Sequence, residues 1–198
     1  MSTALKEQPD RNKTRLLLKL FSPIIAVIIL IATDANFYVY PIIFSLVISL
    51  TNLEHLKPKI IIGITLSIVF SYVSFFIGIL GANVFDKVIE ILSLQKEFKV
   101  GIWLTVDLVY TLSTFILSPL AVFFLFKFIF EFPKTKITRW TQYIAIIILI
   151  MNSVIPESAF GLFNVFNFWQ IIMILSLQII MNQRALVFPE GNQVKSSV

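Results

Sequence analysis

The 198-residue sequence contains no cysteine, one histidine and six glycines, and only 14% of its residues are charged. Without cysteine the chain can form neither disulfides nor thiolate metal sites, and it has no thiol nucleophile. The single histidine, His55, has no second imidazole to join it in a metal or proton-transfer site, so we expect its side chain to be solvated. None of the patterns GxxxxGK[ST], HExxH and GxSxG occurs. We therefore expect no enzyme activity, no metal and no cofactor.

The scarcity of charge also excludes an ordinary soluble domain. Such domains carry about 25% charged residues, whereas 58% of this chain is hydrophobic. A helix needs about 20 residues to cross a hydrocarbon core about 30 Å thick. Apolar runs of about that length lie at 16–33, 37–53, 60–82, 100–130, 140–155 and 163–182. The sequence therefore predicts an all-α membrane bundle of six transmembrane helices over residues 15–184, with polar tails at 1–14 and 185–198. The fourth run is long, so it must tilt, kink at Pro119 or begin at the interface.

The basic residues predict how these runs are oriented. Of the sixteen lysines and arginines, thirteen fall on the side of the two tails, and three, Lys87, Lys96 and Lys99, fall on the other side. Because cytoplasmic loops carry the basic excess, we expect both termini in the cytoplasm and a multi-pass protein of the inner or plasma membrane. The orientation of the helices and the attraction of lysines and arginines to anionic lipid headgroups explain the net charge of +5. We therefore expect the lipid bilayer, and no nucleic acid, as a partner.

The largest outer segment, residues 83–99, combines apolar residues at helical spacing with balanced charges. Val84, Val88 and Ile91 alternate with Asp86, Lys87 and Glu90. This pattern predicts an amphipathic helix lying in the outer interface, either as a connector or as a gate or docking surface.

Small residues recur along one face of the third run at spacings of four, four, three, four and three. They are Gly63, Ser67, Ser71, Ser74, Gly78 and Gly81. Small residues let two helices approach closely where lipid supplies no hydrophobic drive, so we expect a helix-packing seam. The alternative is a flexible face that lines a path.

Polar residues inside the apolar runs are the candidate pathway residues. Asp107, Thr111, Thr114 and Ser118 share one helix face, along which a cation, a proton or a polar substrate could pass. Alternatively, the hydroxyls bond to their own helix and Asp107 lies at the wet interface.

A second group of polar residues lies near the ends of the fifth and sixth runs. Glu157 follows Pro156, which can unwind the helix, and Asn152 lies one turn earlier; the alternative is an ordinary helix end. On the sixth run we expect interhelical hydrogen bonds rather than a binding site. The residues concerned are Asn164, Asn167, Gln170 and Gln178.

Three short motifs, FYVYPIIF at 37–44, KPKIIIGIT at 57–65 and ALVFP at 185–189, carry a resemblance to a known group. With the basic start at Arg15, they resemble the inner-membrane components of the fusaric-acid-resistance and aromatic-acid exporters. The segment FNFW at 166–169 is similar to Yip1-type membrane domains. The exporter resemblance implies a half-sized subunit that forms a homo-oligomer, works with a periplasmic adaptor protein and moves amphipathic organic acids, with Asp107 or Glu157 titrating.

Two functions therefore stay open. The first is a transporter or efflux-pump membrane subunit for small amphipathic organic compounds. The second is a non-transporting membrane binder, such as an immunity protein that recognises a pore-forming toxin.

Overall fold

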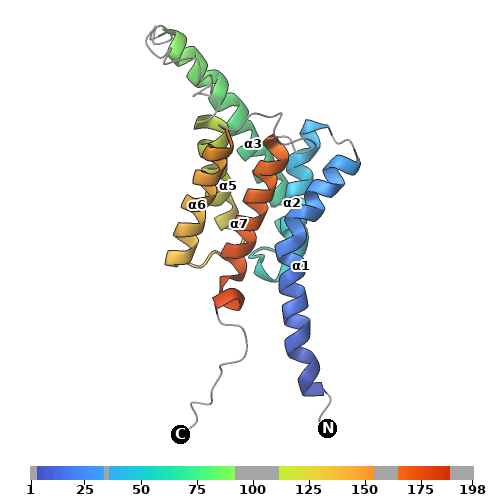
Figure 1. Ribbon diagram of the computed structural model, residues 1–198. Helices are drawn as coiled ribbons and strands as arrows, with labels where there is room; N and C mark the ends of the chain where they lie inside the picture. Colours follow the sequence, from blue (N-terminus) through green and yellow to red (C-terminus); the bar gives the residue numbers. More distant parts are fainter. Residues whose placement is uncertain (1–3, 34–35, 92–111, 154–164, 188–198) are drawn as a thin grey trace.

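The computed structural model describes residues 4–33, 36–91, 112–153 and 165–187, and these residues form helices joined by short connections (Figure 1). The predicted all-α class is confirmed, since the described residues contain no strand. The elements are α1 (Ala4–Ala32), η1 (Phe37–Val39), α2 (Tyr40–Thr51), η2 (Leu53–His55), α3 (Ile60–Ile91), the π-helix η4 (Ser113–Leu117), α5 (Ser118–Ile129), α6 (Lys136–Ser153) and α7 (Val165–Val187).

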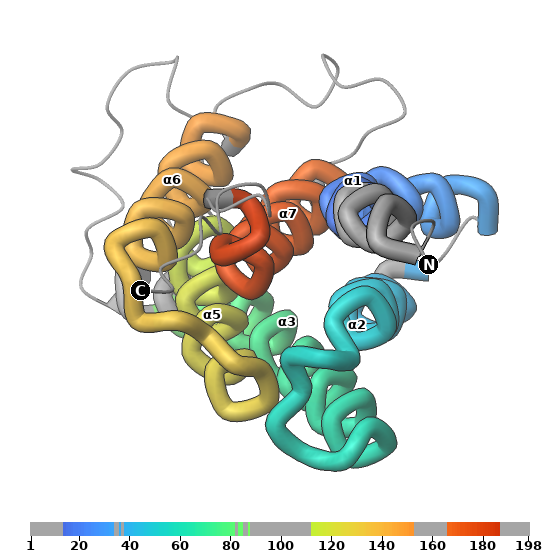
Figure 2. Tube along the Cα trace, turned by 90° about the horizontal axis from the view of Figure 1, so that it is seen from below, coloured from blue at the N-terminus to red at the C-terminus, as the bar shows by residue number. Residues whose placement is uncertain are grey.

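The helices alternate in direction between two ends of the bundle. The start of α1, the end of α7 and the α2–α3 and α5–α6 connections lie at one end, here called the basal end (Figure 1). The opposite end is the distal end. Viewed along the bundle, α6, α7 and α1 form one row and α5, α3 and α2 form a second row (Figure 2). Because α7 contacts α1, α2 and α6, it joins the two rows.

Two stretches are long and apolar enough to cross a membrane, Thr14–Ala32 in α1 and Ile60–Gly81 in α3. The helices Tyr40–Thr51 and Ser113–Ile129 are apolar but shorter. Two helices are thus long and apolar enough to support a membrane location, and the six predicted spans are not all supported. Large apolar side chains also stay exposed, including Leu18 on α1, Phe128 on α5 and Ile147 on α6. Such continuous apolar surface suits contact with lipid.

Two predicted boundaries differ from the structure. The expected interfacial helix begins at residue 83, but residues 83–91 continue α3 without a break and extend beyond the other helices (Figure 1). No proline follows Gly81 in this helix, and Asn83 Nδ2 donates to the Ile79 carbonyl of the preceding turn at 3.1 Å. Residues 92–99 lie outside the described residues. The predicted polar tail, 1–14, is helical from Ala4 onward.

Candidate functional site

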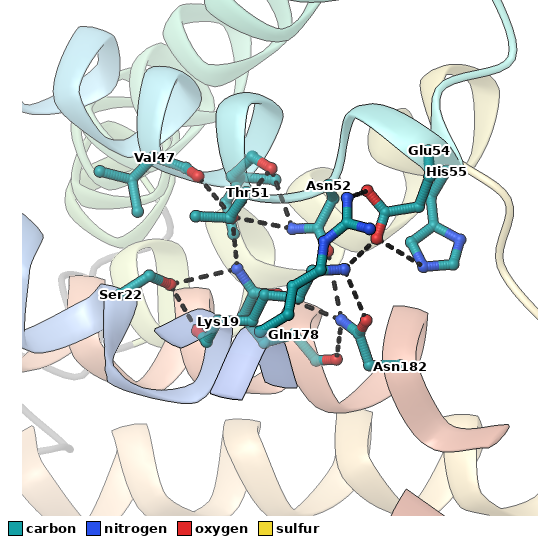
Figure 3. A network of polar contacts seen from close by, with 11 residues as sticks. Lys19, Ser22, Val47, Thr51, Asn52, Glu54, His55, Gln178 and Asn182 are labelled. Carbon is teal, nitrogen blue, oxygen red and sulfur yellow. Dashed lines mark hydrogen bonds and ion pairs between the residues drawn. The ribbon is translucent and has the colours of Figure 1, made fainter. Parts of the chain in front are cut away.

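A cluster of charged and amide side chains lies buried at the basal end, between α1, α2 and α7 (Figure 3). We call it the basal polar cluster. Lys19, on α1, has a side chain only 7% exposed. Its ammonium group donates to Glu54 Oε1 and to Asn182 Oδ1, the latter at 2.9 Å. Arg15, one turn earlier on α1, donates from Nη2 to Glu54 Oε2 at 3.2 Å. One carboxylate is therefore held between two cations.

Amides of α7 connect this ion pair to α2. Asn182 Nδ2 donates to Asn52 Oδ1 at 3.2 Å, and the backbone of α7 departs from helical geometry at Asn182 (φ −103°, ψ 15°). One turn earlier, Gln178 Nε2 donates to Ser22 Oγ at 3.1 Å and to Thr51 Oγ1 at 2.7 Å. Gln178 thus confirms the predicted interhelical hydrogen bonds. These buried groups satisfy one another, which fixes how α1, α2 and α7 pack.

The two titratable groups of η2 have shifted pKa values. Burial raises the pKa of the Glu54 carboxyl, but the hydrogen bond from Lys19, a backbone hydrogen bond and the charges of Lys19 and Arg15 outweigh burial, so this pKa lies below its ordinary value of 4.5. Burial lowers the pKa of His55 below 6.5, although the Glu54 carboxylate opposes that shift. The His55 side chain is 24% exposed, so it is solvated in part.

Backbone hydrogen bonds tie the two basal connections together. The Lys57 amide donates to the Ile129 carbonyl at 2.8 Å, and the Glu131 amide donates to the His55 carbonyl at 2.9 Å. Leu56 and Phe130 form an isolated antiparallel bridge between them. These bonds join the helix pair α2–α3 to the pair α5–α6 at the basal end.

A cavity lies toward the distal end, between α2, α3, α7 and the η4–α5 helix. We call it the distal cavity. Its empty volume is about 590 Å³, including the part open to the surroundings. It is lined by Tyr40, Pro41, Phe44, Ser71, Phe75, Gly78, Ile79, Thr114, Ser118, Val122, Phe166, Trp169 and Gln170. These lining residues include no charged side chain.

The π-helix η4 shapes one wall of the cavity. The Ser118 amide bonds to the Ser113 carbonyl five residues earlier, so the same register would pair the Thr114 carbonyl with residue 119. Residue 119 is proline and has no N–H. The Thr114 carbonyl instead accepts a hydrogen bond from Trp169 Nε1 at 3.2 Å. The π-helix and Pro119 together therefore create the acceptor that fixes the Trp169 ring against this wall.

Gln170 is a second polar residue that lines the cavity, and its side-chain amide has an unsatisfied oxygen. The residue is 2% exposed, and its Nε2 donates to the Tyr40 carbonyl at 2.9 Å. Because a carbonyl can only accept, this contact fixes which way the amide is oriented. Its Oε1 accepts no hydrogen bond from the described residues. The cavity wall therefore contains a buried acceptor that no described donor satisfies.

Aromatic rings separate the distal cavity from the basal end. Phe44 makes a T-shaped contact with Phe126, with centroids 5.8 Å apart, and a tilted contact with Trp169 at the same separation. Phe126 stacks on Phe130 at 5.7 Å. Phe44, Phe126 and Phe130 are at most 2% exposed. Packed, buried rings thus continue from Phe44 of the cavity wall to Phe130 at the end of α5.

The structure describes only some of the predicted pathway residues. Asp107, Thr111 and Glu157 lie outside the described residues. Thr114 lines the distal cavity. Asn152 is 1% exposed, and neither Nδ2 nor Oδ1 bonds to a described residue. Asn152 and Thr114 are therefore both buried, but no contact between them is established.

The predicted seam follows α3 past several partners. Ser71 accepts a hydrogen bond from Ser45 of α2 at 2.6 Å. Gly78 lies where an added Cβ would be 3.3 Å from Ser118 Cβ. Gly81 lies where an added Cβ would collide with Ser113 Oγ. Three seam positions remain. An added Cβ at Gly63 would meet Leu56 of the α2–α3 connection. The hydroxyls of Ser67 and Ser74 donate to α3 carbonyls four residues earlier. Both Ser71 and Gly78 also line the distal cavity.

The basal polar cluster was not predicted. Lys19 was counted only among the basic residues that set orientation. The signal in the sequence is that Lys19 is flanked by leucines on both sides, within the first apolar run. A charge placed inside an apolar run indicates a buried partner.

Comparison with protein-family models, with curated proteins and with solved structures finds no match for this chain.

Proposed function

We propose that this chain is a six-pass protein of the inner or plasma membrane, with its basal end in the cytoplasm, and that it transports small amphipathic organic compounds. The observation that carries the proposal is the distal cavity. Its largely apolar wall with a few polar groups is typical of small-molecule sites.

The closed basal end is the second support. Phe44 of the cavity wall packs on the buried Phe126, and the basal polar cluster joins three helices through hydrogen bonds and an ion pair. A cavity on one side and a polar closure on the other is the arrangement of a carrier with one side shut. Passage of a compound requires these contacts to separate.

The topology can be tested directly, because the chain contains no cysteine. Single cysteines replace Lys134, in the basal α5–α6 connection, and Asn83, near the distal end of the α3 span; both positions are exposed. A membrane-impermeant maleimide added to intact cells should label Asn83→Cys only. Permeabilised cells should label both. Labelling of Lys134→Cys in intact cells would refute the proposed orientation.

Transport is tested with N-phenyl-naphthylamine, a neutral aromatic amine that fluoresces in membranes. Cells are loaded without an energy source, then energised, and the loss of fluorescence is followed. The protein should accelerate this loss relative to cells without it. Val122→Phe, which places a larger side chain in the cavity wall, should abolish the effect. Leu120→Phe on the same helix is the matched control, because Leu120 is 47% exposed outside the cavity. Equal rates in all strains would refute transport and favour a non-transporting membrane binder.

A further inference from the structure

We propose that the distal cavity binds uncharged aromatic compounds that carry a hydrogen-bond donor, such as phenols, and that Gln170 Oε1 accepts this bond. The inference rests on the proposed function, because it names the compounds that the cavity would carry. It differs from the organic acids that the exporter resemblance implies.

The first argument is electrostatic. The described residues that line the cavity include no lysine, arginine or histidine. An organic anion entering an apolar cavity loses its hydration, and it needs a cation or several donors to compensate. Lys19 and Arg15, the cations of the basal polar cluster, are engaged with Glu54 beyond the layer of packed rings. An ionised carboxylate therefore finds no counter-charge among the described lining residues.

The second argument is the balance of donors and acceptors. Two lining donors are already used, Trp169 Nε1 by the Thr114 carbonyl and Gln170 Nε2 by the Tyr40 carbonyl, while the Ser71 hydroxyl on the wall accepts a hydrogen bond from Ser45. Among the buried side-chain atoms of the lining residues, the one without a described hydrogen-bond partner is an acceptor, Gln170 Oε1. A ligand that donates one hydrogen bond completes this site, whereas a carboxylate places another acceptor against it. The hydroxyls of Thr114 and Ser118 can serve either kind of group and do not distinguish the two.

The third argument is the shape of the wall. Phe44, Phe75, Phe166 and Trp169 contribute aromatic surface. Aromatic rings prefer offset or edge-to-face contacts with other rings, and the tilted Phe44–Trp169 pair leaves such surfaces available to a planar ligand. A flat aromatic body with a single hydroxyl or amine fits this combination.

The test compares three matched probes on the full-length chain in lipid nanodiscs at neutral pH. The probes are para-fluorophenol, para-fluorotoluene and para-fluorobenzoate, and binding is followed by fluorine NMR. Empty nanodiscs correct each value for partition into lipid. We expect para-fluorophenol to bind on the order of fivefold more tightly than para-fluorotoluene, because one neutral hydrogen bond changes the dissociation constant by about this factor. We expect para-fluorobenzoate to bind no more than it does to empty nanodiscs.

Two variants assign the effect to the cavity. Gln170→Leu removes the acceptor and should erase the preference for para-fluorophenol over para-fluorotoluene. Val122→Phe fills the cavity from α5, keeps the Gln170 side chain in the sequence and should abolish binding of both neutral probes. Leu120→Phe should bind like the unaltered chain.

Three results would overturn the inference: benzoate binding as tight as phenol binding, an unchanged phenol preference in Gln170→Leu, or full binding in Val122→Phe. The proposed function fails separately. Phenol binding that depends on Gln170, without efflux of N-phenyl-naphthylamine, refutes transport and keeps the site. Efflux without any Gln170-dependent preference refutes the ligand class and keeps transport.

Discussion

Replacing Glu54 by glutamine tests whether the basal polar cluster stabilises the bundle through its buried charge. Lys19 is 7% exposed, whereas Glu54 is 36% exposed and is also paired with Arg15. Removing the carboxylate leaves a buried ammonium with amide acceptors only. Breaking a fully buried pair costs about 3–5 kcal/mol. Because Glu54 is partly solvated, we expect Glu54→Gln to lower the free energy of unfolding by about 2–3 kcal/mol.

The matched control uses the other cation of the same carboxylate. The Arg15 side chain is 65% exposed, so Arg15→Met should cost no more than about 1 kcal/mol, as for surface ion pairs. Lys19→Met should cost about 2 kcal/mol, because the charged hydrogen bonds to Glu54 and Asn182 disappear. The double variant, Lys19→Met with Glu54→Gln, should cost clearly less than the sum of the single changes.

The free energies are measured by SDS titration in mixed micelles at neutral pH, with tryptophan fluorescence as the signal and far-ultraviolet circular dichroism as a check on helix content. The reasoning is refuted if Lys19→Met and Arg15→Met cost the same. It is equally refuted if the Lys19 and Glu54 changes are additive, since the two side chains would then not interact.

Three further predictions concern other parts of the bundle. Gly81→Ala places a methyl group against the Ser113 hydroxyl and should cost about 1–3 kcal/mol in the same titration, while Ser113→Ala in that background should recover part of the loss. Trp169→Phe keeps the ring but removes the donor to the freed π-helix carbonyl, so it should cost about 1–3 kcal/mol; Pro119→Ala, which restores an N–H, should recover stability only in that background. The pKa of His55 is lowered in the folded chain, so its contribution to stability is present above pH 6.5 and is lost as the pH falls through the native pKa. His55→Asn should therefore flatten the loss of stability below pH 6.5, and an unchanged pH profile would contradict the assignment.

The helices were predictable because each depends on a local run of apolar residues. Residues 37–53 and 163–182 were predicted as spans, and α2 and α7 lie at those positions. The end of α3 was not predicted, because the charges after residue 82 suggested a new element although nothing there interrupts the helix. For the long fourth run, the sequence left open a tilt, a kink at Pro119 or a start at the interface, and it did not indicate a π-helix. The π-register before Pro119 depends on contacts that Ser113 and Trp169 make with other helices.

The candidate sites depend on contacts between distant residues, and local patterns do not show these. Small residues on α3 indicated a close partner, but not that Gly78 and Gly81 would face η4. Gln170 and Gln178 have the same residue type and lie on the same helix, yet Gln178 is satisfied within the basal polar cluster while Gln170 keeps an unpaired acceptor. Asn182, four residues after Gln178, donates to Gln178 Oε1 at 3.2 Å, whereas the residue four after Gln170 is Ile174, which has no side-chain donor.

The central position of α7 has a consequence for how the protein is made. Lys19 lies on α1, but its amide partner, Asn182, lies 163 residues later, on α7. Until α7 is synthesised, the Lys19 ammonium can pair with Glu54, which follows 35 residues later, but it lacks its amide partner, and the row of α6, α7 and α1 lacks its middle member. Assembly of the bundle is therefore completed only after translation of α7. A chain truncated before Val165 therefore keeps the Lys19–Glu54 ion pair but lacks the helix that joins the two rows, so an early stop in translation yields helices that cannot complete the bundle.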